Sequence, residues 1–395
     1  MVNYDFSKTK STKARILAAI RYFNTISIKN ISNYCELSIP IVTRYVESML
    51  QDGLLKEQVT SVTTAGRKPK LFSLNADYGY IIGIELGLLH MAKIGMFTFD
   101  GSLTSNTSLR YAPRWSAEET IGNVMDTIEK QLKAGFIDRK RILYIVIGNP
   151  GIVNPDTGSI ELSAEFATWS KMPLKHLFQH HFDVPVEVIN DVNLSAIGEK
   201  EFGIGHGYNN FMLIRQSVGL KAGIILKNRL YQGESYAAGE IGHSILPIIE
   251  DGNIVLKKAE SYLCMAAICE QIAARLNDDP NDIFYSITGG NPQNVTADNI
   301  VKALGTPSYV NEYISKAGER IGHVLVNVVT ALDIALIILS GDVTKFNNYY
   351  IKPIREVLSE CLTYPPTILA SSLGDDVALY GAFSVGQESI LENIP

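Results

Sequence analysis

The first 75 residues contain three short stretches in which apolar side chains recur at helical spacing. The first stretch predicts a helix through Ile16, Leu17, Ile20 and Phe23. Ser11-Thr12 can cap this helix, Ser27 can cap a second, and Ser38 can cap a third with Pro40 in its first turn. The pattern therefore predicts three helices in succession.

The apolar side chains of the third predicted helix form one stripe, made of Val42, Val46, Met49 and Leu50. The opposite face then points outward, and it carries Ser38, Pro40, Thr43, Arg44 and Glu47. In a helix-turn-helix, side chains in such positions reach base edges in the major groove. We therefore expect Ser38, Thr43 and Arg44 to contact DNA.

Two β-type stretches after the third helix predict a hairpin, or wing. The polar run 58–63 and the apolar run 71–74 flank a tip with the sequence GRKP, in which Arg67 and Lys68 precede the proline. Two long cations beside a residue of fixed φ suit a narrow minor groove, where the negative potential is enhanced. The alternative is a solvated hairpin with ordinary surface charges. Because it follows three short helices, the hairpin favours a winged helix-turn-helix in residues 1–75, with Arg67 and Lys68 on DNA.

From residue 76 the pattern changes to alternating strands and helices, which predicts an α/β body. Strands are expected at 81–84, 93–97 and 143–147, and a helix at 118–134. Asp100-Gly101 is a hairpin signal after the second strand. Towards the C-terminus, a helix over 311–332 is expected to lead into a strand over 335–339.

One strand-to-helix junction in this body carries a polar pair. The β-type run 186–189 stops at Asn190-Asp191, and a helical pattern follows. In open α/β sheets small molecules bind beyond the carboxyl ends of strands, where a carboxylate can accept hydrogen bonds from a polyol or take its proton. The alternative is that Asp191 merely caps the helix. A second polar cluster, GEIGH at 239–243, favours the ligand-binding interpretation.

The charges are distributed unevenly between the two parts of the chain. Residues 1–75 carry 11 Lys and Arg against 5 Asp and Glu, a net +6, while residues 76–395 carry 24 against 36, a net −12. Phosphate neutralisation needs cations on one part only. A nucleic-acid reader attached to a small-molecule sensor has this distribution of charge.

Two further features bear on location and redox state. The N-terminus lacks the apolar segment of a secretory signal, so a cytoplasmic protein is expected. The apolar run 321–339 contains His323, Asn327 and Asp333, which favours a buried helix and strand over a membrane span. The cysteines lack a CxxC pair and therefore predict neither a disulfide framework nor a local zinc knuckle; they are Cys35, Cys264, Cys269 and Cys361.

Four segments with their spacing resemble the ROK family (repressors, unclassified open reading frames and sugar kinases). They are Asn149-Pro150-Gly151, Asn190-Asp191-Val192-Asn193, the glycine-rich run 217–223 and the GEIGH segment 239–243. The resemblance extends from residue 78 to the C-terminus. It implies an actin/hexokinase-like, ribonuclease H-like body of two α/β lobes in residues 76–395. The GRKP tip resembles the wing of the family's repressors, whose DNA-binding module the family's sugar kinases lack.

The resemblance also implies a sugar site. Asn190, Asp191, Glu240 and His243 match family residues that hydrogen-bond sugar hydroxyls, and Glu260 matches the glutamate that follows the family's cysteine cluster. In a kinase Asp191 would be the general base, whereas here we expect a ligand anchor and no catalytic residue. The alternative for His243 is a buried structural histidine.

Two glycine-rich loops that hold phosphates in the family's kinases depart from the pattern here. The first, Asp-x-Gly-Gly-Thr in the family, is Glu85-Leu86-Gly87-Leu88-Leu89, and the second, Gly-x-Gly-x-Gly, has Lys221 in place of its middle glycine. Glycine lets the backbone approach a phosphate closely. ATP-dependent transfer is therefore not expected, and Lys221 leaves open residual binding of a nucleotide or sugar phosphate.

Many family members hold a structural zinc with the histidine of GEIGH and a following three-cysteine cluster. Between His243 and Glu260 this chain has no cysteine, and Cys264 and Cys269 lie on an apolar helical run. We therefore expect no zinc, no other metal and no cofactor.

The sequence thus predicts a repressor of carbohydrate-related genes that binds operator DNA and a sugar or sugar derivative, as a homodimer or a dimer of dimers and without a membrane segment. One alternative is an ATP-dependent sugar kinase with an appended DNA-binding domain. Another is a constitutive DNA-binding protein with a vestigial cleft, or one controlled by a protein partner.

Overall fold

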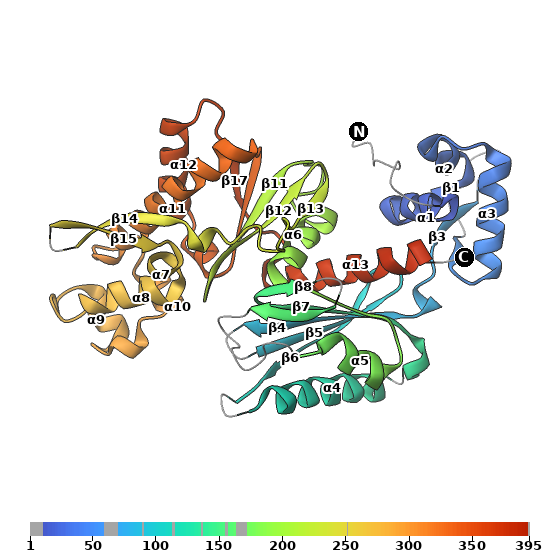
Figure 1. The fold of residues 1–395 in the computed structure, drawn as a ribbon, viewed down its shortest axis with the longest axis horizontal. Coiled ribbons are helices and arrows are strands. Elements are labelled where there is room, and N and C mark those ends of the chain that lie inside the picture. The colour runs from blue at the N-terminus through green and yellow to red at the C-terminus, as the bar shows by residue number, and fades with distance from the viewer. Residues whose placement is uncertain are drawn as a thin grey trace. The chain divides into compact units, whose positions relative to one another are not determined.

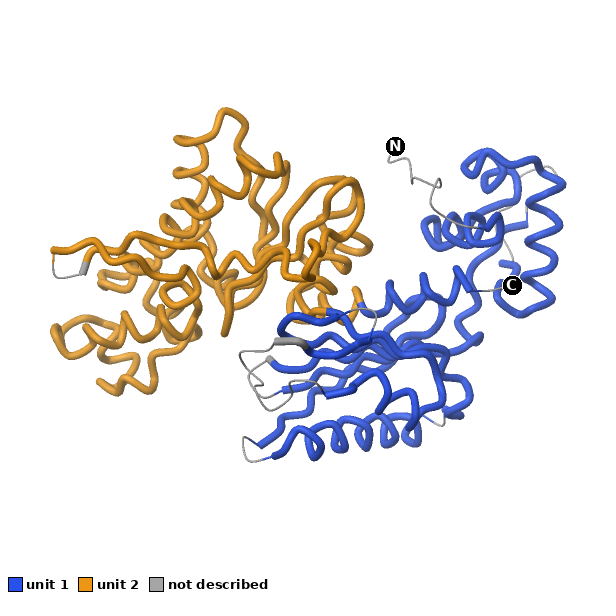
Figure 2. The backbone as a smooth tube through the Cα atoms, in the orientation of Figure 1, with its two compact units in different colours: residues 1–189, 382–395 blue, residues 190–381 orange. Residues whose placement is uncertain are grey.

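The computed structural model describes residues 11–58, 70–88, 91–112, 115–135, 137–154, 157–162, 172–250 and 252–393. The chain divides into two compact units, coloured separately in Figure 2. Unit 1 comprises residues 1–189 and 382–395, and unit 2 comprises residues 190–381. The predicted domain boundary at residue 75 lies inside unit 1 and stays a prediction.

Unit 1 begins with a small module of three helices and a short sheet. Its elements are α1 (Thr12–Phe23), β1 (Ile26–Ser27), α2 (Ile28–Cys35), α3 (Ile39–Gln51), β2 (Leu55–Gln58) and β3 (Leu71–Leu74). The strands are ordered β1-β3-β2, and both pairings are antiparallel. Ser11 Oγ accepts a hydrogen bond from Ala14 N at 3.1 Å, and Ser27 Oγ accepts one from Asn30 N at 3.3 Å. The three predicted helices and two of their predicted caps are confirmed.

Three details of this module differ from the sequence prediction. Ser38 holds the N-cap position of α3, but its side chain makes no capping hydrogen bond. Phe23 leaves the apolar stripe of α1 and is 43% exposed, because it lies in the last turn. β2 begins at Leu55, ahead of the expected start at Gln58, and the remaining residues of that expected strand, 59–63, lie outside the described residues. The tip with Arg67 and Lys68 lies outside the described residues.

The rest of unit 1 is built on a five-stranded sheet with helices against both faces (Figure 1). Its main elements are β4 (Tyr80–Leu88), β5 (Met91–Thr98), β6 (Leu103–Arg110), α4 (Ala117–Ala134), β7 (Ile142–Asn149), β8 (Ile152–Asn154), β9 (Ser159–Leu162), α5 (Leu174–Phe182) and β10 (Val186–Asn190). The sheet order is β10-β7-β4-β5-β6, and β8 and β9 form a separate pair. Ile121 and Val124 of α4 and Phe178 of α5 are buried in the core beneath the sheet.

Unit 2 contains a second five-stranded sheet, in the order β13-β12-β11-β16-β17. Its strands are β11 (Phe211–Gln216), β12 (Leu220–Leu226), β13 (Arg229–Tyr231), β16 (Leu336–Ser340) and β17 (Thr367–Ala370), and a separate hairpin is formed by β14 (Ile245–Glu250) and β15 (Asn253–Lys258). Its helices are α6 (Asp191–Phe202), α7 (Glu260–Leu263), α8 (Met265–Ala274), α9 (Ile283–Thr288), α10 (Ala297–Ala303), α11 (Val310–Leu332) and α12 (Asn348–Cys361). The last helix, α13 (Val377–Asn393), begins in unit 2 and ends in unit 1.

The two large sheets share one topology. In each, the first three strands in sequence run antiparallel to their neighbours, and the fourth pairs in parallel with the first: β7 with β4 in unit 1, and β16 with β11 in unit 2. The predicted α/β class with two lobes is confirmed. Because the first and fourth strands are parallel, their carboxyl ends lie at the same edge of each sheet, where ligands bind in open α/β folds.

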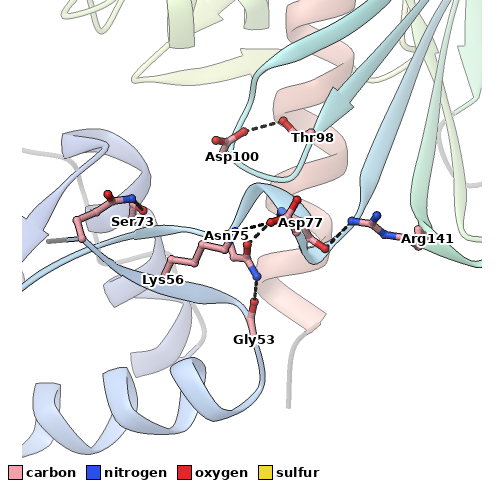
Figure 3. A network of polar contacts seen from close by, with 9 residues as sticks. Gly53, Lys56, Ser73, Asn75, Asp77, Thr98, Asp100 and Arg141 are labelled. Atoms are coloured by element: carbon pink, nitrogen blue, oxygen red, sulfur yellow. Dashed lines mark hydrogen bonds and ion pairs between the residues drawn. The ribbon is translucent and has the colours of Figure 1, made fainter. Parts of the chain in front are cut away.

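Fixed polar contacts join the N-terminal module to the body within unit 1 (Figure 3). Asn75 Nδ2 donates to Gly53 O at 2.7 Å, and Asn75 Oδ1 accepts from Asp77 N at 3.1 Å. Asp77 also pairs with Lys56, and its carbonyl oxygen accepts from Arg141 Nη2 at 2.6 Å. The Lys56 ammonium lowers the pKa of the exposed Asp77 carboxyl. The module is therefore held to the body by side chains and not by the chain connection alone.

Candidate functional site

The five residues expected to bind a ligand all belong to unit 2. Asn190 and Asp191 open α6, Glu240 and His243 lie in and beside the short 3₁₀ helix η5 (Ile241–His243), and Glu260 opens α7. The strands β11 and β12 supply the cations that pair with two of them.

Asn190, and not Asp191, caps α6. Its Oδ1 accepts hydrogen bonds from Val192 N at 3.0 Å and Asn193 N at 3.1 Å. The alternative that Asp191 merely caps the helix is therefore wrong. Asn190 fixes the N-terminus of α6 and so sets the direction of the carboxylate that follows it.

Asp191 forms a buried ion pair with Arg215 of β11. The two residues are 6% and 8% exposed, and Arg215 Nη1 lies 3.3 Å from Asp191 Oδ2. The other carboxylate oxygen, Oδ1, is buried and has no hydrogen-bond partner among the described residues. A buried acceptor without a donor costs about 1–3 kcal/mol. A ligand hydroxyl bound at Oδ1 would remove this cost.

A second ion pair lies beside the first. Arg215 and Lys221 face each other as register partners in the antiparallel β11–β12 ladder. Like charges in such positions are destabilising unless they are offset. The offset for Lys221 is Glu240, whose Oε1 lies 3.2 Å from Lys221 Nζ, and both side chains are partly buried. Lys221, which replaces the middle glycine of the second loop, thus pairs with Glu240, whose carboxylate the sequence assigned to the ligand.

Glu260 also has a protein partner. Its Oε2 accepts a hydrogen bond from Leu220 N at 3.1 Å, at the first residue of β12. Its carboxylate therefore fixes the glycine-rich loop before β12 to the start of α7. One oxygen is engaged with the backbone, which gives Glu260 a positioning role, and its contact with a ligand stays a prediction.

The GEIGH segment is attached to β12 through Gly239. Ala222 N donates to Gly239 O at 2.8 Å, and Gly239 has a φ of +89°. A Cβ atom at this position would lie 1.9 Å from Ala222 O, so only glycine allows the contact. This contact explains why the segment begins with glycine, and it places Glu240 within reach of Lys221.

His243 is exposed at the end of η5. The alternative of a buried structural histidine is therefore wrong. An exposed imidazole can donate and accept hydrogen bonds, which suits a hydroxylated ligand.

Cys264, at the N-cap of α8, and Cys269, within α8, are only partly buried, and Cys269 packs against the core of unit 2. Burial raises the pKa of Cys269 to about 11 and raises the pKa of Cys264, so both stay protonated near neutral pH. Metal binding requires thiolates. Within the described ranges, no three His, Cys, Asp or Glu side chains gather closely enough to hold a metal ion.

The outward face of α3 carries the side chains expected to contact DNA. Ser38 and Arg44 are exposed, and Arg44 lies over the ring of Tyr45 at 5.2 Å. The Thr43 hydroxyl donates to Ile39 O at 2.9 Å and can still accept a hydrogen bond.

Sequence reasoning missed two apolar side chains on this face. Ile39 and Ile41 are 51% and 39% exposed. The signal was available, because both fall outside the stripe of Val42, Val46 and Met49. Exposed aliphatic side chains on such a helix can contact thymine methyl groups.

Known proteins match this chain along most of its length. A family model described as the ROK family matches residues 81–389. A xylose repressor of Caldicellulosiruptor bescii is 27% identical over 382 residues, which cover 94% of each chain. Across the residues described, no helix is both long and apolar enough to cross a membrane.

Two solved structures share the fold. A ROK family transcriptional regulator, a homolog of the E. coli MLC protein, superposes with a TM-score of 0.80 at 21% identity and covers 96% of both chains. A ROK family glucokinase from Streptomyces griseus, in complex with glucose and AMPPNP, has a TM-score of 0.66 at 24% identity. It covers 78% of this chain and 99% of its own.

Proposed function

We propose, since this chain belongs to the ROK family, that it is a DNA-binding transcriptional repressor controlled by a sugar or sugar derivative. The observation that carries the proposal is the N-terminal module. It precedes the family's matched region, carries a net charge of +6 where the rest of the chain carries −12, and presents a helix with exposed Ser38 and Arg44. The similarity to a xylose repressor extends over this module as well as the body. A repressor of this kind acts in the cytoplasm, where its operator DNA is.

The ligand site fits a polyol. Asp191 Oδ1 needs a donor, and a sugar hydroxyl supplies one. His243, three residues after Glu240, is exposed and can exchange hydrogen bonds with further hydroxyls. The charges of Asp191 and Glu240 are offset by Arg215 and Lys221, so an uncharged ligand leaves the balance undisturbed. The relatives named xylose repressors make a pentose the first sugar to test.

The ligand site is connected to the end of the chain through α6. Within unit 2, α6 and the first turn of α13 touch backbone to backbone: a Cβ on Gly381 would lie 1.9 Å from Leu194 O, and one on Gly198 would lie 2.2 Å from Val377 O. Such close contact transmits small displacements, because neither helix can move without the other. A ligand that shifts α6 at Asp191 therefore shifts the start of α13.

The other end of α13 reaches the DNA-binding module. Within unit 1, Gln387 is fully buried and its Nε2 donates to Phe99 O at 2.6 Å, while its Oε1 accepts from Arg21 of α1 at 3.5 Å. Phe383 stacks on Phe97 with ring centroids 5.0 Å apart. We infer a population shift in which the ligand favours one arrangement of α6 and α13, and this arrangement sets the spacing of two recognition helices in a homodimer.

A sugar screen with two readouts tests this function. Duplex DNA selected by the protein from a random pool serves as the probe, and aldoses and their phosphates serve as ligands. The active sugar is expected to raise the melting temperature and to change affinity for the DNA by about 5- to 150-fold, the range of ordinary allosteric coupling. A sugar that stabilises the protein without changing DNA affinity contradicts the mechanism, and selection of no DNA at all contradicts the function.

The alternative function is a sugar kinase with an appended DNA-binding domain, and the structural similarity to a ROK family glucokinase is the reason to test it. Two observations oppose it. Lys221 replaces the middle glycine of the second loop and pairs with Glu240, and in the first loop Leu88 and Leu89 replace the glycine and the hydroxyl residue of the kinase pattern. A phosphate-binding loop needs open backbone amides and hydroxyls, and both loops depart from this requirement.

We therefore expect no phosphorylation of the stabilising sugar by Mg-ATP. The variant Lys221→Gly is expected to stay inactive, because the first loop is altered as well. A coupled assay for ADP release, run beside a direct assay for sugar phosphate, measures this. Turnover that depends on both sugar and Mg-ATP and is lost in Asp191→Asn would establish the kinase instead.

A further inference from the structure

The β14–β15 hairpin stands out from the rest of unit 2 in Figure 1. Its two strands pair only with each other among the described strands, in antiparallel register from Ile245 opposite Lys258 to Glu250 opposite Asn253. A bond from Ala259 N to Ser244 O at 2.7 Å closes its base. A two-stranded hairpin has one face on the core and one on solvent, and the solvent face is normally polar.

Here both faces are apolar. The inner face packs into the core through Leu246 and Ile248, which are 5% and 3% exposed. The outer face carries four large aliphatic side chains in the open: Ile245 at 57%, Ile249 at 76%, Ile254 at 74% and Leu256 at 68% exposed. Pro247, opposite Leu256 in the register, is exposed on the same face. We call these five residues the hairpin plate.

The hairpin plate is large for a monomer surface. Side chains exposed to this extent present roughly 500 Å² of contiguous surface, near the upper end of the largest patch on an ordinary monomer. A standard stable interface buries about 800 Å² per partner, with an apolar centre and a polar rim. The plate therefore has the size of an interface centre.

The arrangement of the plate favours a second copy of the same chain. Ile249 faces Ile254 and Pro247 faces Leu256 across the ladder, so the plate is flat and similar on its two strands. A two-fold axis in the plane of the contact and along the strands would set Ile249 of each copy over Ile254 of the other, and Pro247 over Leu256. The aliphatic side chains of the two copies would then cover each other.

We propose that the hairpin plate is the centre of a two-fold interface between two copies of this chain. Each plate covers the other and removes its aliphatic side chains from water. The hairpin lies in sequence between His243 and Glu260, so this interface would join directly to two residues of the proposed ligand site. The proposal goes beyond the proposed function, which requires a dimer but does not say which surface forms it.

The double variant Ile249→Glu with Ile254→Glu tests the interface. Wild-type protein is expected to sediment as a dimer at micromolar concentration, and the variant is expected to have a dimer dissociation constant raised at least about 100-fold, because two carboxylates would be buried against a like pair. Tyr364→Glu is the matched control, since Tyr364 is 87% exposed elsewhere in unit 2. It should leave the dimer intact.

Ile254→Ser with Leu256→Ser gives a second, milder variant in case two glutamates prevent folding. It should weaken the dimer in the same direction while circular dichroism and the sugar-induced thermal shift persist. A wild-type monomer at all concentrations overturns the proposal. So does a variant that folds and dimerises like the wild type, whatever the outcome of the DNA and sugar assays.

Discussion

Replacing Asp191 with asparagine is expected to abolish the sugar response. The substitution keeps the size of the side chain but changes the group that faces Arg215 and the ligand. Arg215, 8% exposed, would lose the carboxylate 3.3 Å away, and removal of one member of a buried ion pair typically costs about 3–5 kcal/mol of folding free energy. The ligand would lose a charged acceptor, which should weaken sugar binding by at least about 100-fold.

The two effects can be separated with a double variant. Asp191→Asn combined with Arg215→Met removes both charges of the pair, so much of the lost stability should return. Sugar binding should not return, because Oδ1 of the carboxylate is still missing. Chemical unfolding measures the first quantity, and sugar-dependent thermal shift or calorimetry measures the second.

The pattern of results decides the role of Asp191. Restored stability with lost sugar binding assigns the carboxylate to the ligand. Restored sugar binding in the double variant would instead mean that Asp191 only neutralises Arg215 and holds α6 in place. DNA binding in the absence of sugar serves as the check that the N-terminal module is intact in every variant.

Local patterns in the sequence were sufficient to predict several of the elements. The helices of the module follow from serine caps and apolar stripes, and α11 and β16 follow from one long apolar run with a break at Asp333. The junction at Asn190-Asp191 was also visible, because a β-type run stops there. Each of these signals is contained within a few consecutive residues.

The pairing of charges in the site could not be read from the sequence. Arg215 meets Lys221 only because β11 and β12 pair in one register, and Lys221 meets Glu240 only because Gly239 is bonded to Ala222. Both facts belong to tertiary structure. Lys221 was interpreted as a possible phosphate contact, whereas its ammonium lies beside a carboxylate.

For the hairpin plate, the apolar residues were visible in the sequence, but their exposure was not. In the sequence of β14 and β15, apolar residues occupy both odd and even positions, so both faces of the hairpin carry them. Periodicity alone cannot say that one face would be exposed, because a strand buried on both sides has the same pattern. Only the two-stranded sheet in unit 2 shows that the outer face lacks cover.

Replacing Arg44 with alanine is expected to weaken binding to the selected DNA by about 10- to 100-fold. Arg44 is exposed on the outward face of α3, and its guanidinium is held near the ring of Tyr45. If it contacts a phosphate, the slope of affinity against salt should become shallower by about one unit, and the loss should be the same on unrelated DNA. If it contacts a base, the loss should be confined to the selected sequence.

Arg229→Ala is the matched control for this experiment, because Arg229 is another exposed arginine, on β13 in unit 2. It removes the same charge from the chain while leaving α3 unchanged. Fluorescence anisotropy across a salt series, with selected and unrelated duplexes, measures both variants. If Arg44→Ala binds as the wild type does at every salt concentration, α3 is not the recognition helix. If Arg229→Ala weakens binding as much as Arg44→Ala does, the effect reflects the net charge of the protein. Long-range attraction to DNA depends little on the position of a cation, whereas a helix in the groove requires its cation at a particular place.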